Sequence, residues 1–454
     1  MGNEAGELDL ANALARFAVE TPDAAIAADA HRVAALSLLD WCAVGIAGAD
    51  EPVAKIIRAD ILRDGGRAEA GLLGSVERVP ARAAALTNGT TSHALDYDDT
   101  HFLHVGHPSV GVIPAVTAVA EAERLPGARV LPAALIGMEA SCRVGHWLGS
   151  GHYNTGFHQT ATAGAFGATL AAARLLGLDR SQTIMALGIA STRASGLKSQ
   201  FGTMGKPLNA GLAASTGVEA ARLAVAGFVS TPAGLTGPQG FGETHARDGV
   251  PVDQALAGLG ERWVFEEVSH KFHACCHGLH AMLEAIGALP SGSFDPKMVD
   301  RIEVVTTPRW LRVCNIPSPA TGLEAKFSYR LTAAMALAGR DTGALATYDA
   351  AACSDPELLM LRDKVSVVTD PEMAETAATV KLHLKDGRVL EASHDLSVQP
   401  PLDHRIAKVR AKSSALLGTD HARSIDGRID ALSTSLEPFT LSWLLHGQDA
   451  AAAA

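Results

Sequence analysis

Apolar residues recur every three or four positions between residues 7 and 260, which is the spacing that places them on one face of a helix. Glycine and proline separate these segments, as in Leu125-Pro126-Gly127, and runs of β-branched residues are nearly absent. The pattern predicts helices over Leu10–Val19, His31–Ile46, Ala81–Leu95, Gly111–Glu123, Val130–Leu148, Thr160–Leu178, Arg180–Ser195 and Lys206–Ala226.

The pattern changes near residue 265. Polar and apolar residues alternate over Arg301–Thr307, as expected for a half-buried strand, and Lys364–Val368 is a second strand candidate. The segments Ala378–Leu384 and Val389–His394 flank an Asp-Gly pair, which suits the positive φ angles of a tight hairpin turn. A helical segment over Phe327–Ala338 lies between them, so residues 267–399 are predicted to form an α+β domain.

Helical spacing returns after Gln399-Pro400-Pro401, over Arg405–Leu417 and Ile425–Leu432. The predicted fold is therefore mainly α. A large all-α domain is formed by both ends of the chain, residues 1–266 and 400–454, and the smaller α+β domain is inserted between them. A length of 454 residues also favours two domains over one.

The composition of the chain argues against several classes of function. The formal net charge of −11, without a basic block, argues against binding to nucleic acid or to an anionic membrane, but leaves a small anionic metabolite possible. The six cysteines show no CxxC spacing, which is typical of reduced thiols in a cytoplasmic protein. Residues Met1–Leu10 lack the apolar core of a signal peptide, and the best apolar run, Ala161–Leu178, is interrupted by Arg174, so no membrane span is expected.

Titratable residues are concentrated between Ser92 and Ser109. A histidine and an aspartate close together can act as general acid and base, and a helix that begins after this run would attract carboxylates to its N-terminus. The alternative is a polar loop whose acids cap helices. The residues concerned are Asp96, Asp98, Asp99, Thr100, His101, His104 and His107.

Two further segments carry candidate substrate contacts. His158 directly precedes a predicted helix, where it could contact a substrate or merely cap the loop. The cations Arg193, Lys198 and Lys206 lie in a stretch of small residues, from which they could bind a carboxylate or stabilise an enediolate. The alternative for a lysine is a solvated surface position.

The segment Ser269–His280 lies at the predicted domain junction, where small-molecule sites often form. It holds Lys271, which can serve as a base if its pKa is lowered, together with Cys276 and His277. Zinc is a competing hypothesis, but the adjacent Cys275 and Cys276 are unusual for a structural zinc site, so no metal and no cofactor are predicted.

Four of these segments, in this order, resemble the MmgE/PrpD family, which includes 2-methylcitrate dehydratase, cis-aconitate decarboxylase and iminodisuccinate epimerase. They read DYDDTH…HPS from Asp96, GFHQTATAGAFGA from Gly156, GKPLNAG from Gly205, and KFHACC from Lys271. The resemblance implies a helical domain, an α+β lid, a homodimer and an active site in the cleft between the domains. By position, the family's active-site residues fall on Asp96, Thr100, His107, Lys206 and Lys271.

Three positions depart from the pattern of the best-known members. The decarboxylases carry histidine where this chain has Cys276, and tyrosine where it has Leu331, although Tyr329 lies close by. The dehydratases typically carry asparagine where this chain has Asp98. The first two departures argue against decarboxylation.

The resemblance implies removal of a proton next to a carboxylate of a small di- or tricarboxylate. Lys206 and Lys271 would bind or activate the carboxylate, and one of them or His107 would be the base. We expect a dehydratase-type lyase, with an epimerase of the iminodisuccinate kind as the alternative; a decarboxylase, or a non-catalytic helical dimer that binds carboxylate or metal, ranks below both. Asp96 would orient His107 or a lysine, Thr100 would bind substrate, and Cys276 could be the second acid of an epimerase. The further candidate contacts are His158, His277, Arg193 and Lys198.

Overall fold

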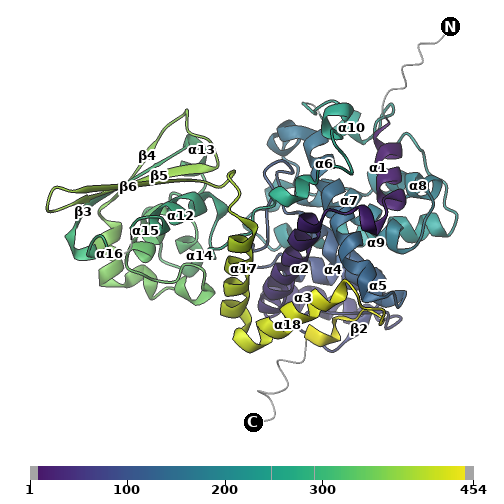
Figure 1. Ribbon diagram of the computed structural model, residues 1–454, viewed down its shortest axis with the longest axis horizontal. Coiled ribbons are helices and arrows are strands. Elements are labelled where there is room, and N and C mark those ends of the chain that lie inside the picture. Colours follow the sequence, from purple (N-terminus) through teal and green to yellow (C-terminus); the bar gives the residue numbers. More distant parts are fainter. Residues whose placement is uncertain (1–8, 247, 291, 445–454) are drawn as a thin grey trace, which may run out of the picture. The chain divides into compact units, whose positions relative to one another are not determined.

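The computed structural model describes residues 9–246, 248–290 and 292–444 (Figure 1). The chain divides into two compact units, Met1–His270 with Leu417–Ala454, and Lys271–Leu416. The expectations about a leader within residues 1–8 lie outside the described residues. Both ends of the chain contribute to the first unit.

The first unit is built from helices. Every helix that the apolar spacing predicts before residue 230 is present, with ends shifted by a few residues, so the mainly α prediction is confirmed. Its elements are α1 (Leu10–Glu20), α2 (Ala28–Gly48), α3 (Pro52–Asp64), β1 (Ala70–Gly71), β2 (Arg78–Val79), α4 (Ala81–Ser92), α5 (Pro108–Ala122), α6 (Val130–Thr155), α7 (Gln159–Leu175), α8 (Arg180–Ser191), α9 (Gly205–Val225), α10 (Phe241–His245), α11 (Val252–Ala255) and α18 (Thr419–Leu432).

Two helices differ from the sequence-based expectation. Helix α3 was not predicted, because it buries only Ala54 and so lacks an apolar stripe. Helix α2 is long and apolar enough to cross a membrane, but 78% of its most apolar window is buried inside the protein. Core helices pass the same test of length and composition, so α2 is weak evidence for a span.

Helices α4, α5, α7 and α9 pack against one another in the first unit, and glycine allows the closest crossing. A methyl group on Gly89 of α4 would lie 2.8 Å from the Cα of Gly211 on α9. A methyl group on Gly211 would collide with the Leu86 carbonyl oxygen and the Thr90 hydroxyl of α4. The backbones of α4 and α9 are thus as close as glycine permits, which fixes the first two turns of α9 relative to the end of α4.

The second unit contains a four-stranded sheet in the order β4-β3-β5-β6. Strand β3 (Val299–Thr306) pairs in parallel with β4 (Val365–Thr369) and antiparallel with β5 (Ala377–Leu384), which continues into β6 (Val389–Asp395). Alternate residues of β5 are buried, and α12 packs on β5 and β6. The helices of this unit are α12 (His280–Gly287), α13 (Pro308–Leu311), α14 (Gly322–Ala325), α15 (Tyr329–Leu337), α16 (Pro356–Arg362) and α17 (Leu402–Leu417).

The predicted hairpin is confirmed. Gly387 adopts a positive φ of 88° in the turn between β5 and β6, and the Asp386 carboxylate accepts a hydrogen bond from the Arg388 backbone N–H. The predicted helix over Phe327–Ala338 begins at Tyr329, because the Ser328 side chain accepts a hydrogen bond from the backbone N–H of Leu331 and caps it.

The second unit extends further along the chain than the proline pair suggests. Helix α17 groups with the second unit up to Leu416 and only α18 returns to the first, whereas the sequence pattern placed the boundary at residue 399. The Lys408 ammonium of α17 lies 2.6 Å from the Glu284 carboxylate of α12, a contact between distant segments that apolar spacing does not reveal.

Replacing Gly211 with alanine should destabilise the protein by about 1–3 kcal/mol, because the added methyl group forces α4 and α9 apart. Gly427→Ala is the matched control: Gly427 lies inside α18, and a Cβ added there would meet no atom of the described residues within 4 Å, so alanine should be neutral or stabilising by up to about 1 kcal/mol. Urea unfolding of both variants measures the difference. Equal effects of the two substitutions would contradict the tight crossing.

Candidate functional site

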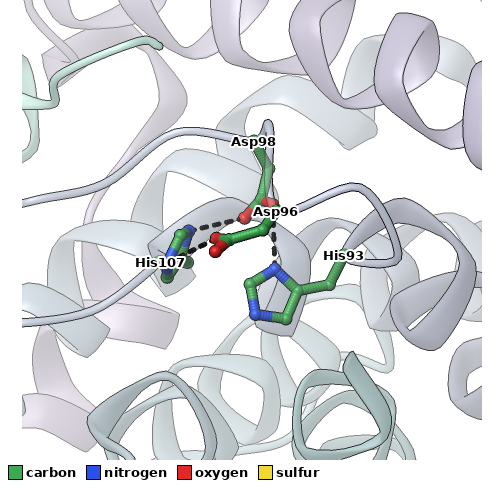
Figure 2. A group of neighbouring side chains, drawn as sticks. All are labelled: His93, Asp96, Asp98 and His107. Atoms are coloured by element: carbon green, nitrogen blue, oxygen red, sulfur yellow. Dashed lines mark hydrogen bonds and ion pairs between the residues drawn. The ribbon is translucent and has the colours of Figure 1, made fainter. Parts of the chain in front are cut away.

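The candidate site is built on the loop that joins α4 to α5. His93 ends α4, and His107 is the residue immediately before α5. Two residues between them adopt left-handed backbone conformations, Asp96 with φ of 51° and Val105 with φ of 54°. Such a conformation costs about 1–3 kcal/mol for a β-branched residue and is common at functional sites. The strained loop turns the side chains of both histidines toward its aspartates (Figure 2).

Asp98 is the central residue of this cluster. Its two carboxylate oxygens lie 2.8 Å from the Nδ1 atom of His93 and 2.8 Å from the Nδ1 atom of His107 (Figure 2). The Asp98 side chain is 1% exposed. One buried carboxylate therefore bridges two imidazole rings.

The charge state of Asp98 follows from these partners. Burial alone would raise its pKa, but the charges of His93 and His107 and their hydrogen bonds hold the pKa well below its usual range. An ionised Asp98 accepts a hydrogen bond from a protonated Nδ1 of His107, which leaves the His107 Nε2 atom as the basic nitrogen. This arrangement suits His107 as a general base.

Asp96 and Lys206 form the more exposed edge of the cluster. The Lys206 ammonium lies 2.6 Å from one Asp96 oxygen, and the His107 Nε2 atom lies 3.6 Å from the other. The Asp96 side chain is 39% exposed, whereas that of His107 is 10% exposed. Lys206 is in the first turn of α9, where the close crossing with α4 holds it beside the loop.

His158 packs against the cluster through the ring of His93. It precedes α7, yet its side chain forms no capping hydrogen bond, so the capping alternative is wrong. Its ring stacks on that of His93, with the ring centroids 6.1 Å apart. It also contacts the Phe201 ring edge to face, with the centroids 5.0 Å apart. Burial, and then the charges of His93 and Lys206, hold the pKa of His158 well below its usual range, so the ring is neutral.

Asp99 has a different environment from its neighbour Asp98. It accepts hydrogen bonds from the backbone N–H and the hydroxyl of Ser109, and so caps the first turn of α5, as the sequence-based alternative of capping acids expects. Burial raises the pKa of Asp99 to about 7, and the nearby charges of Asp40 and Asp98 also raise it. Asp99 is therefore a carboxyl group that titrates near neutral pH.

Of the other predicted site residues in the first unit, Thr100 belongs to the same loop, where its backbone pairs with that of Ser269. Lys198 donates a hydrogen bond to the Tyr153 carbonyl oxygen and lies over the Tyr153 ring. Arg193 forms an ion pair of 2.8 Å with Glu219 and is 47% exposed. The structure thus gives Lys198 and Arg193 local partners away from Asp96 and His107.

Three predicted residues belong to the second unit. Lys271 is buried there, and the Cys276 sulfur lies 3.2 Å from that of Cys314. His277 packs its ring 4.9 Å from His280.

The donor atoms of the cluster also satisfy the spacing of a metal site. His93, Asp96, Asp98 and His107 each offer one ligand atom, all within 4.8 Å of one another. The same atoms have partners in the protein, since Asp98 is shared by the two histidines and Asp96 pairs with Lys206. The ammonium group supplies a positive charge next to the carboxylates, as a metal ion would.

Sequence reasoning missed two residues of this cluster, His93 and Asn209. Asp98 was named within the titratable run but was given no role of its own. The signal for His93 is a histidine at the end of a buried helix. Asn209 was missed entirely: its side-chain amide nitrogen lies 3.1 Å from the His158 Nδ1 atom. Its position one turn after Lys206 in α9 was the available signal.

Replacing Asp99 with asparagine should remove a pH dependence of stability. The pKa of this carboxyl group is about 7 in the folded protein and about 3.9 in the unfolded chain. Its contribution to the free energy of unfolding is therefore fully present below pH 4 and is lost as the pH rises to 7. The stability of the natural protein relative to Asp99→Asn should therefore fall by up to about 4 kcal/mol between pH 4 and pH 7. Urea unfolding at several pH values measures this difference.

Asp420→Asn provides the control, because Asp420 is 99% exposed on α18. Its stability difference from the natural protein should change little over the same range. If the stability difference between Asp99→Asn and the natural protein also changes little with pH, then the pKa of Asp99 is not raised.

Comparison with known proteins extends over both units. A family model described as the MmgE/PrpD N-terminal domain matches residues 12–252, and one described as the MmgE/PrpD C-terminal domain matches residues 273–431. The chain is 26% identical over 470 residues to the cis-aconitate decarboxylase-like protein oryM of Aspergillus oryzae, covering 96% of this chain and 97% of that protein.

Two further relatives carry the name cis-aconitate decarboxylase. The chain is 28% identical over 397 residues to the protein of Homo sapiens, covering 82% of this chain and 80% of that one. It is 34% identical over 231 residues to the protein of Aspergillus terreus, covering 48% and 47%. Since the two family models together match most of its length, the chain belongs to the MmgE/PrpD family.

Proposed function

We propose that this protein is a cofactor-independent enzyme that removes a proton next to a carboxylate of a small di- or tricarboxylate, as a dehydratase-type lyase. The observation that carries the proposal is the pair formed by Asp98 and His107 beside the ion pair formed by Asp96 and Lys206. An oriented imidazole and an ammonium group within one cluster are the two elements that this chemistry requires.

In this proposal His107 is the base. Asp98 holds the His107 ring through Nδ1, and its negative charge stabilises the imidazolium that forms when Nε2 accepts the substrate proton. Lys206 binds the carboxylate next to the carbon that loses the proton and stabilises the resulting enediolate. Thr100, which belongs to the same loop as Asp98, is proposed to bind a further polar group of the substrate.

The fate of the enediolate distinguishes the candidate reactions. Loss of a β-hydroxide yields the dehydrated product, whereas return of a proton to the opposite face yields the epimer. An epimerase needs a second acid to return that proton to the opposite face.

Decarboxylation is a further candidate, because relatives with 26–34% identity are named for that reaction or as similar to proteins that perform it. One observation counts against it. The hydroxyl of Tyr329 donates to the Gly278 carbonyl oxygen at 2.6 Å and the side chain is fully buried, so Tyr329 is a poor substitute for the tyrosine that Leu331 replaces.

Lys206→Met and His107→Gln should each lower kcat/KM by about 10²–10³, since each removes a group that acts on charge in the transition state. Lys55→Met is the matched control, because Lys55 is an exposed lysine that pairs with Asp50 on the surface. It should retain normal turnover. Normal turnover in both Lys206→Met and His107→Gln would refute the assignment.

The reaction is tested by proton NMR in D₂O with citrate, 2-methylcitrate, cis-aconitate, tartrate and the stereoisomers of iminodisuccinate. Exchange of a carbon-bound proton with loss of water supports the dehydratase. Inversion without a new product supports the epimerase, and release of carbon dioxide from cis-aconitate supports the decarboxylase. Absence of both exchange and turnover with every compound would contradict the proposed chemistry for this substrate class.

The absence of a cofactor is tested separately. Because Lys206 pairs with Asp96 and both histidine rings contact Asp98 at 2.8 Å, the carboxylates have partners within the protein, and activity should survive dialysis against a strong chelator. Elemental analysis should then find less than one metal ion per chain. Loss of activity on dialysis, with recovery on adding a divalent ion, would favour a metal at the cluster. The resemblance also implies a homodimer, and sedimentation equilibrium can test this oligomeric state.

A further inference from the structure

The imidazole of His158 has a neutral amide as its partner. The Asn209 amide nitrogen lies 3.1 Å from the His158 Nδ1 atom, and both side chains are buried. His158 comes from the start of α7 and Asn209 from the second turn of α9, three residues after Lys206. The same helix therefore supplies the cation of the site and the partner of this histidine.

A second contact fixes the orientation of the amide. The Asn209 Nδ2 atom also lies 3.4 Å from the carbonyl oxygen of Leu197, which can only accept a hydrogen bond. The nitrogen end of the amide therefore faces both groups, and it donates to the His158 Nδ1 atom. A nitrogen that accepts carries no proton, so the proton of the neutral His158 ring is on Nε2.

The opposite arrangement holds at His107. The Nδ1 atom of His107 faces the carboxylate of Asp98, an acceptor, so that Nδ1 carries the proton and Nε2 is basic. The Nδ1 atom of His158 faces a donor, so that Nε2 carries the proton. The two rings thus have opposite tautomers because one partner is an aspartate and the other an asparagine.

We propose that Asn209 is a positioning residue that holds His158 as the neutral Nε2–H tautomer, so that His158 donates a hydrogen bond to an oxygen of the polycarboxylate and His107 alone is the imidazole base. The proposal rests on the proposed function. A neutral donor can bind a carboxylate or stabilise an enediolate oxygen without removing a proton from it. The His158 ring is buried and lies within electrostatic reach of Lys206 and Asp96, which form the more exposed edge of the cluster.

The tautomer is measured by two-bond ¹H–¹⁵N NMR on the full chain labelled with ¹⁵N-histidine. The His158 signals are identified by their loss in His158→Gln. In the natural protein at neutral pH, they should show a protonated Nε2 and an unprotonated Nδ1. Asn209→Asp should shift them to the Nδ1–H tautomer or to imidazolium, because a carboxylate accepts the proton that the amide could not.

Two further variants complete the test. Asn209→Leu offers neither donor nor acceptor and should give a mixture of tautomers. Asn12→Asp is the control, since the Asn12 carbonyl accepts a hydrogen bond from Arg180 and should leave the His158 signals unchanged. A protonated Nδ1 in the natural protein, or an unchanged tautomer in Asn209→Asp, would overturn the proposal. The spectrum of the natural protein decides the tautomer even if a variant fails to fold.

The donor role is tested by adding tricarballylate, a saturated tricarboxylate, while calorimetry reports binding. The Nε2–H signal of His158 should shift in proportion to occupancy. Binding without that shift would overturn the donor role. Failure of tricarballylate and of every compound in the substrate panel to bind would instead overturn the proposed function, and the tautomer result would still stand or fall by its own spectrum.

Discussion

The geometry of the site depends on one buried carboxylate. Asp98 is almost fully removed from water, which on its own would favour the neutral acid. Two imidazole rings, those of His93 and His107, stabilise the ionised form and are in turn fixed by it. Removing either ring would leave a buried charge with half of its compensation, so the three side chains form one unit. The rest of the loop, including the left-handed Asp96, is shaped around this unit.

The loop combines carboxyl groups with different charge states within a short stretch. Asp98 is ionised by its histidines, whereas Asp99 has a pKa near neutral and hydrogen-bonds Ser109 at the start of α5. Asp96 is the more exposed of the three and pairs with Lys206. The three aspartates thus have different roles, because their burial and partners differ. Asp98 orients His107, Asp99 caps α5, and Asp96 pairs with the charge of Lys206.

The sequence predicted the elements that depend on local spacing. The helices of the first unit and the Asp-Gly hairpin follow from periodicity and turn chemistry, and the structure confirms them. Apolar spacing could not reveal α3, which is mostly exposed, or the attachment of α17 to the second unit, which involves Lys408 and the distant Glu284. Such contacts between distant segments leave no periodic signal.

Within the site, the sequence identified Asp96, His107 and Lys206, and the structure brings these three together. The sequence did not predict which of these side chains contact one another. The sequence assigned Asp96 to orient His107 or a lysine, and the structure pairs Asp96 with Lys206, whereas the left-handed turn at Asp96 leaves Asp98 facing the His107 Nδ1 atom. Periodicity carries no information about such a turn, because an isolated non-glycine residue in this conformation has no pattern. Lys198 and Arg193 show the converse problem, since both were selected as cations near Lys206, yet tertiary packing pairs them with Tyr153 and Glu219 from other helices.

The contact between Gly89 and Gly211 limits how the site can diversify. Each residue is already the smallest possible, so an enlargement at one position cannot be offset by a reduction at the other. The distance between the backbone of α9 and the end of α4 is consequently at its lower bound. The cation of Lys206 can therefore come no closer to the loop through a tighter crossing of these two helices, and only a longer side chain at position 206 would extend its reach from the same backbone.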